Sequence, residues 1–116
     1  MATDTLGQKQ RKFTKMIAQL ILWVYETLPG YELTVGDFYR DPRLHGDMGV
    51  KKAYGHKNSG HKVRLAGDLN LFINGVYKMD TESHRVIGEK WESMGGSWGG
   101  RFADGNHYSL EHNGVK

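Results

Sequence analysis

The chain has 116 residues, which is the size of one small domain, so we expect residues 1–116 to form a single unit. A composition of 38% hydrophobic and 25% charged residues excludes disordered, collagen-like and coiled-coil proteins. The absence of cysteine excludes disulfides, thiolate catalysis and cysteine-ligated metals. The net charge of +3 mildly favours an anionic partner without identifying it.

A helix is predicted from about residue 6 to Leu28, where Pro29-Gly30 ends it. Its apolar residues recur at steps of three and four. Basic residues precede the apolar run 16–25, as in a signal peptide, but the run is about ten residues long and a bilayer needs about 20. We interpret the segment as a core helix, without an export signal or stable membrane insertion.

Short strands are predicted at residues 31–35, 64–73, 76–79 and 107–110, with a hairpin turn at Asn74-Gly75. A second helix is predicted to begin at Thr81 and to end in the glycine-rich segment 95–100. Residues 37–60 are polar and are expected to form a long loop. The pattern indicates an α+β fold in which a small antiparallel sheet packs against helices.

Candidate chemistry gathers around the strand at residues 64–73. Alternation puts Asp68 on the open face of the sheet and the aliphatic residues on the helix side. His61 must then lie on a bend before the strand, which Gly60 or Gly67 would provide. Asp104 and His107 flank Gly105-Asn106, a pair suited to a tight turn with positive φ.

Each of these residues also has a simpler interpretation. Most histidines in loops are solvated or bonded to the backbone, and for His45, His56 and His84 this is the favoured interpretation. Asp68 alone would be a solubilising charge, and Asp104 would merely begin a turn. Trp91 fits the core, whereas Trp98 lies among glycines that offer little core.

Two motifs together resemble a known family. The pattern Ser59-x-His61-x-x-Arg64-x-Ala66-x-Asp68, followed by Trp98-Gly99-Gly100 and Asp104-x-x-His107, resembles the zinc peptidoglycan peptidases of the D-Ala-D-Ala carboxypeptidase and L-alanyl-D-glutamate endopeptidase type, including phage endolysins. The resemblance covers residues 33–110. Arg64 departs from the glycine that many relatives have. The resemblance implies a hedgehog/D,D-peptidase-like fold with a zinc site on the open sheet face.

The resemblance also implies roles for individual residues. The zinc ligands would be His61, Asp68 and His107, with His112 as a rival to His107. The catalytic residues would be Asp104, as general base, and Arg40, which would steady the oxyanion. The substrate would meet Arg40, Ser59 and Trp98.

We therefore expect a monomeric, zinc-dependent peptidase that cuts peptidoglycan stem peptides. The favoured bond is L-Ala–D-Glu, in a phage-type endolysin that stays in the host cytoplasm until a holin releases it to the periplasm and cell wall. The alternatives are a D-Ala-D-Ala carboxypeptidase and a non-catalytic wall-binding module on the same fold. No nucleic acid is expected as a partner, because the sequence has no recognised reader motif.

Overall fold

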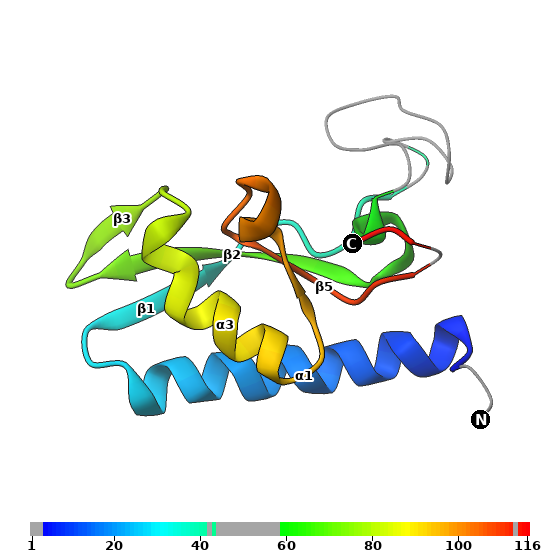
Figure 1. Cartoon of the computed structure of the whole chain (residues 1–116), viewed down its shortest axis with the longest axis horizontal. Coiled ribbons are helices and arrows are strands. Elements are labelled where there is room, and N and C mark those ends of the chain that lie inside the picture. The colour runs from blue at the N-terminus through cyan, green and yellow to red at the C-terminus, as the bar shows by residue number, and fades with distance from the viewer. Residues whose placement is uncertain (1–3, 42, 44–58, 113) are drawn as a thin grey trace.

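An antiparallel sheet packed against helices α1 (Leu6–Thr27) and α3 (Arg85–Ser93) makes up the fold (Figure 1). The computed structural model describes residues 4–41, 43, 59–112 and 114–116. The predicted α+β class is confirmed. Most of the loop predicted at residues 37–60 lies outside the described residues.

Helix α1 begins and ends close to the predicted residues, and its N-terminus is capped. The Thr5 hydroxyl accepts a hydrogen bond from the Gln8 N–H, and the Gln8 side chain accepts one from the Thr5 N–H. The apolar face of α1 is buried at five positions, namely Phe13, Met16, Ile17, Leu20 and Val24. In the part of the chain that the structure describes, no helix has the length and apolar character needed to cross a membrane.

The sheet has the strand order β1-β2-β5-β4, and β3 pairs with β2 beyond the end of β5. The strands are β1 (Tyr31–Val35), β2 (Ala66–Ile73), β3 (Val76–Lys78), β4 (Ser97–Trp98) and β5 (His107–Ser109). The predicted hairpin joins β2 to β3, and its turn residues Asn74 and Gly75 have φ values of 50° and 79°. Such left-handed values suit Asn-Gly in a two-residue hairpin turn.

The two faces of β2 differ as the alternation predicts. Leu69 and Leu71 are fully buried in the core that α1 and α3 share with the sheet. Asp68, Asn70 and Phe72 alternate with them and are partly exposed on the opposite face. The open face is therefore the one that carries the candidate ligand.

The second helical region is more divided than the sequence predicts. A 3₁₀ turn, η2 (Glu82–His84), precedes α3, and the Asp80 carboxylate accepts hydrogen bonds from the backbone and hydroxyl of Ser83. The glycine-rich segment ends α3 as expected, but it then contributes strand β4 and a second 3₁₀ turn, η3 (Gly99–Phe102). These elements lie next to β5 and carry the chain to Asp104.

Candidate metal centre and cleft

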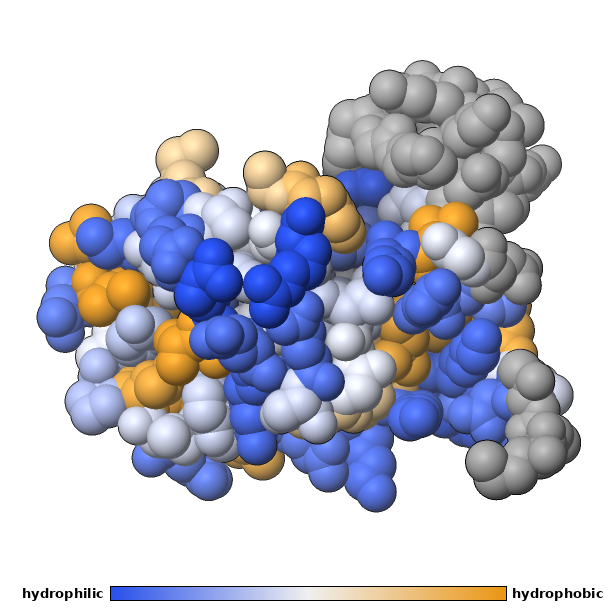
Figure 2. All heavy atoms as spheres, in the orientation of Figure 1, coloured by the Kyte–Doolittle hydropathy of each residue, from blue (hydrophilic) through white to orange (hydrophobic). Residues whose placement is uncertain are grey.

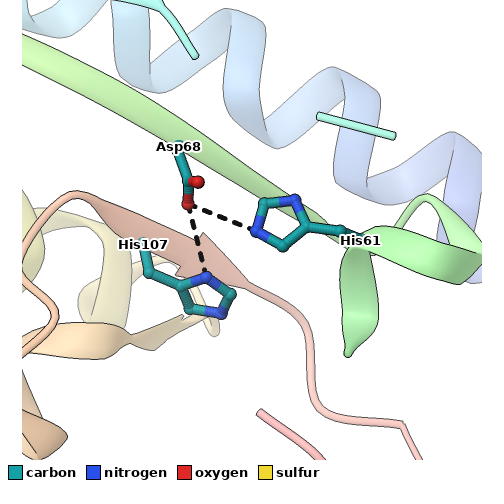
Figure 3. A group of neighbouring side chains, drawn as sticks. All are labelled: His61, Asp68 and His107. Atoms are coloured by element: carbon teal, nitrogen blue, oxygen red, sulfur yellow. Dashed lines mark ion pairs between the residues drawn. The ribbon is translucent and has the colours of Figure 1, made fainter. Parts of the chain in front are cut away.

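Three side chains from distant parts of the sequence meet on the open face of the sheet (Figure 3). Asp68 on β2 is paired in register with His107 on β5, so both side chains leave the same face. His61 reaches them from the 3₁₀ turn η1 (Gly60–Val63) that precedes β2. One ligand atom from each of the three residues lies within 4.8 Å of the other two.

The contacts within this group suit a metal ion better than hydrogen bonding. His61 Nε2 lies 3.2 Å from Asp68 Oδ1, and His107 Nδ1 lies 3.5 Å from the same oxygen. Yet neither ring nitrogen of His61 has an aligned hydrogen-bond partner among the described residues, although the side chain is 1% exposed. Two ligand atoms of a tetrahedral zinc site lie about 3.4 Å apart, which is between the two distances measured here. Two buried imidazoles and a carboxylate are thus a fitting donor set for zinc.

The carboxylate of Asp68 is charged throughout the neutral range. Burial alone would raise its pKa, but the contacts of His107 and His61 outweigh burial and lower the pKa to about 2. A permanently ionised carboxylate between two imidazoles makes the group ready to bind a cation.

The bend that presents His61 lies at Arg64, not at Gly60 or Gly67 as expected. Arg64 ends η1 with φ of 57°, in the left-handed region, whereas neither glycine has a positive φ. The guanidinium of Arg64 lies 3.9 Å from the centre of the Tyr39 ring. The left-handed conformation explains why glycine suits this position, and stacking on Tyr39 helps to hold an arginine there.

Ser59 and Arg40 are tied to the backbone of His61. The Ser59 hydroxyl accepts hydrogen bonds from the His61 N–H and from Arg40 Nη1, at 3.2 and 3.1 Å. The Arg40 N–H donates to the His61 carbonyl, and Arg40 Nε lies 3.5 Å from Asp37 Oδ2. Arg40 is thereby held as a cation beside the centre.

Asp104 stands at the start of a rigid turn that ends at His107. Three carbonyl oxygens of the turn accept hydrogen bonds. The His107 N–H donates to the Asp104 carbonyl, and the Leu69 N–H donates to the Asn106 carbonyl. Trp98 Nε1 donates to the Gly105 carbonyl. The predicted turn is present, but the expected positive φ lies at Ala103, at 61°, and not within Gly105-Asn106. The turn therefore fixes Asp104 relative to His107 without left-handed central residues.

A cavity of about 610 Å³ opens beside this group. Four of the candidate residues line it, namely Arg40, Ser59, Asp104 and His107. Phe102 and residues 114–116 complete its wall. A cation, a carboxylate and a candidate metal ligand thus face one space large enough for a peptide segment.

Trp98 lies in the core and does not line this cavity. It is 1% exposed, and its indole N–H donates a hydrogen bond of 2.7 Å to the carbonyl of Gly105. Direct contact between Trp98 and substrate stays a prediction, whereas the structure shows its hydrogen bond to the turn.

The other histidines lie elsewhere. His112 Nδ1 is 3.3 Å from Lys9 Nζ and is not part of the cluster. His84 is buried and contacts the Lys78 carbonyl and the Tyr108 hydroxyl, in agreement with the simpler interpretation. His45 and His56 lie outside the described residues.

The sequence reasoning missed two close approaches that shape the turn. A Cβ at Gly99 would overlap the carbonyl oxygen of Asp104 and lie 2.7 Å from His107 Cβ. A Cβ at Gly105 would lie 2.7 Å from Thr81 Cα. The Trp98-Gly99-Gly100 motif was the sequence signal for the first of these. Only the tertiary contacts show that Gly99 leaves space for the Asp104 carbonyl and His107.

A comparison with protein-family models finds a match to D-alanyl-D-alanine carboxypeptidase over residues 53–110, half of the chain. The matched segment contains Ser59, the three residues of the metal group and Asp104. No curated protein and no solved structure matches the chain.

Proposed function

Because the chain belongs to the D-alanyl-D-alanine carboxypeptidase family of zinc peptidases that act on peptidoglycan, we propose that it is an endopeptidase that hydrolyses the L-Ala–D-Glu bond of the stem peptide. The observation that carries the proposal is the convergence of His61, Asp68 and His107 beside a cavity. His107, Arg40 and Asp104 line that cavity. This arrangement supplies a metal site, a base and a cation in one cleft.

The metal would be held by one nitrogen of His61, one nitrogen of His107 and a carboxylate oxygen of Asp68. When bound, zinc supplies Lewis acidity that polarises a carbonyl and makes a water molecule acidic near neutral pH. Ser59 orients the backbone that carries His61, and the turn from Asp104 orients His107. The protein therefore holds its donors in place before the metal arrives.

The proton transfers fall to Asp104. Its carboxylate is exposed in the cavity wall, and it would accept a proton from the attacking water and deliver it to the nitrogen of the leaving amine. Arg40, fixed by Ser59 and Asp37, would stabilise the negative charge that develops on the carbonyl oxygen. Each role needs only residues that already line the cleft.

An open arrangement around Asp104 favours cleavage within a chain over removal of a terminal residue. Asp104 lines the cavity of about 610 Å³ and also a second one of about 170 Å³, so there is space on two sides of the base. Arg40 is also suited to holding a terminal carboxylate, which keeps D-Ala-D-Ala carboxypeptidase as the alternative.

Digestion of purified muropeptides by the zinc-loaded protein, with mass spectrometry of the products, tests the proposal. Fragments cut between L-Ala and D-Glu, lost on chelation and regained on adding zinc, are the expected result. Free D-alanine would replace the proposal by the carboxypeptidase alternative. Binding to murein with no product under any metal condition would indicate a wall-binding module.

We further propose an endolysin role for the chain, with storage in the host cytoplasm until a holin-type release to the cell wall, as a monomer. Lysis of host cells should then require co-expression of a holin, and sedimentation should give the mass of one chain. Lysis without a holin would contradict the release step.

A further inference from the structure

A second cavity lies on the other side of the Asp104 turn. Its volume is about 170 Å³, and it sits at the gap in the sheet where β3 ends at Lys78 and β5 begins at His107. Both of these strands pair with the same edge of β2, which leaves Asn70 beside the gap. Asp104 lines both cavities, so the second cavity neighbours the cleft.

The wall of this second cavity is polar, and Asp104 is its acidic side chain. Asn70, Thr81 and Asn106 bring amide and hydroxyl groups to it. Lys78 is paired in register with Leu71, so its side chain leaves the helix side of the sheet and not the open face. This lining suits uncharged hydroxyl and acetamido groups better than a carboxylate.

An aromatic pair continues the cavity along the open face. Tyr77, which lines the cavity, lies directly opposite Phe72, with ring centroids 5.2 Å apart. Tyr77 is 49% exposed although it belongs to a strand. Other exposed apolar side chains gather at this hairpin end of the molecule (Figure 2), including Val76 and Met79. Exposed aromatic rings beside hydroxyl and amide groups are the usual means of binding a sugar ring, whose C–H groups pack on the ring face.

We propose that this second cavity and the Phe72–Tyr77 pair form a subsite for the N-acetylated muramyl sugar that carries the stem peptide. The inference rests on the proposed L-Ala–D-Glu specificity, because of the two bonds considered only that one lies close to the sugar. The lactyl group and L-Ala are two extended units that span about 7 Å, whereas five units, about 17 Å, separate the sugar from the D-Ala–D-Ala bond.

The spacing along β2 lies between these two lengths, and it has to hold both the lactyl-alanyl link and the sugar ring. Phe72 follows Asp68 by four residues on the same face, a separation of about 13 Å. A sugar attached about 7 Å from the scissile bond would reach across Asn70 to the aromatic pair. The D-Glu side of the bond would then occupy the larger cavity, where the Arg40 cation suits its free carboxylate.

Binding of N-acetylmuramyl-L-alanine to the zinc-loaded protein, measured by calorimetry, tests the subsite without requiring turnover. N-acetyl-L-alanine is the matched probe, since it lacks the sugar. We expect the muramyl probe to bind about tenfold more tightly, and Tyr77→Ala to abolish the difference while Tyr77→Phe retains it. Val76→Ala is the control, because Val76 lies opposite Ile73 and faces the other side of β3.

Equal dissociation constants of the two probes for the wild-type protein would overturn the subsite, as would a difference that survives Tyr77→Ala. Thermal melting and zinc content show that each variant is folded, and Asn70→Ala provides the same test if Tyr77→Ala does not fold. Failure of the subsite is separate from failure of the proposed function. Loss of the binding difference with L-Ala–D-Glu cleavage intact rejects only the subsite, whereas sugar-dependent binding without cleavage rejects only the peptidase specificity.

Discussion

The indole nitrogen of Trp98 holds the carbonyl oxygen of Gly105 at 2.7 Å, inside the protein and one residue after the candidate base. The hydrogen bond links strand β4 to the turn that carries both Asp104 and His107. Trp98 is thus a positioning residue for the cleft.

Replacement of Trp98 by phenylalanine should therefore affect the site as well as the fold. Trp98→Phe leaves the buried Gly105 carbonyl without its donor, which should lower the free energy of unfolding by about 1–3 kcal/mol. Displacement of Asp104 should lower kcat about tenfold or more. Denaturant unfolding and muropeptide kinetics measure the two effects. Trp23→Phe on α1 is the control, and a stability loss with unchanged kcat would contradict the positioning role.

The base and the metal ligand of the turn should respond differently to substitution. Asp104 is exposed and outside the metal group, so Asp104→Ala should retain zinc while kcat falls by about 10²–10⁴. His107→Ala removes a ligand and should lose both zinc and activity. Zinc content of the purified variants and rates on muropeptides separate the cases. Ordinary turnover by Asp104→Ala would refute its role as base.

Gly99 should not accept a side chain. A Cβ there would overlap the Asp104 carbonyl oxygen and crowd His107 Cβ, so Gly99→Ala must displace the turn. We expect a loss of about 1–3 kcal/mol in the free energy of unfolding, together with weaker zinc binding. Gly7→Ala is the matched substitution, since only the end of the Arg11 side chain is near and alanine favours a helix. A Gly99→Ala variant with wild-type stability and zinc affinity would show that the close approach does not matter.

Stability should depend on pH through His84. Burial lowers the pKa of His84 below its ordinary value of 6.5, so the folded protein keeps this imidazole neutral while the unfolded chain protonates it. The unfolded state then binds more protons, and stability rises with pH. The contribution of neutral His84 to the free energy of unfolding is complete above pH 6.5. It is lost as the pH falls through that value toward the lower pKa of the folded state. The measurement is the free energy of unfolding from pH 5 to 8.

The variant His84→Gln isolates this effect, because glutamine does not titrate and the wild-type protein has other histidines. As the pH falls, the wild-type protein should lose unfolding free energy relative to the variant. A difference that is constant from pH 5 to 8 would show that His84 has the same pKa in both states.

Much of the fold follows from local pattern. Three- and four-residue spacing and a capping box define α1, and the alternation of Asp68 with leucines defines the two faces of β2. Asn74-Gly75 specifies the hairpin because its left-handed turn needs those residue types. Such features depend on neighbours in sequence, so they can be recognised without a structure.

The site depends on contacts between distant segments. Motif spacing identified His61, Asp68 and His107 as candidates, but only the pairing of β2 with β5 brings the last two opposite each other. The burial of Trp98 was equally hidden, because a glycine-rich sequence does not reveal the core that forms around it. The bend at Arg64 was misassigned to a glycine, since stacking on Tyr39 is a tertiary contact. Sequence by itself determined which residue types were available and which face of each element they occupy. Tertiary structure decided which of them meet, because long-range packing and strand register set distances that local periodicity does not contain.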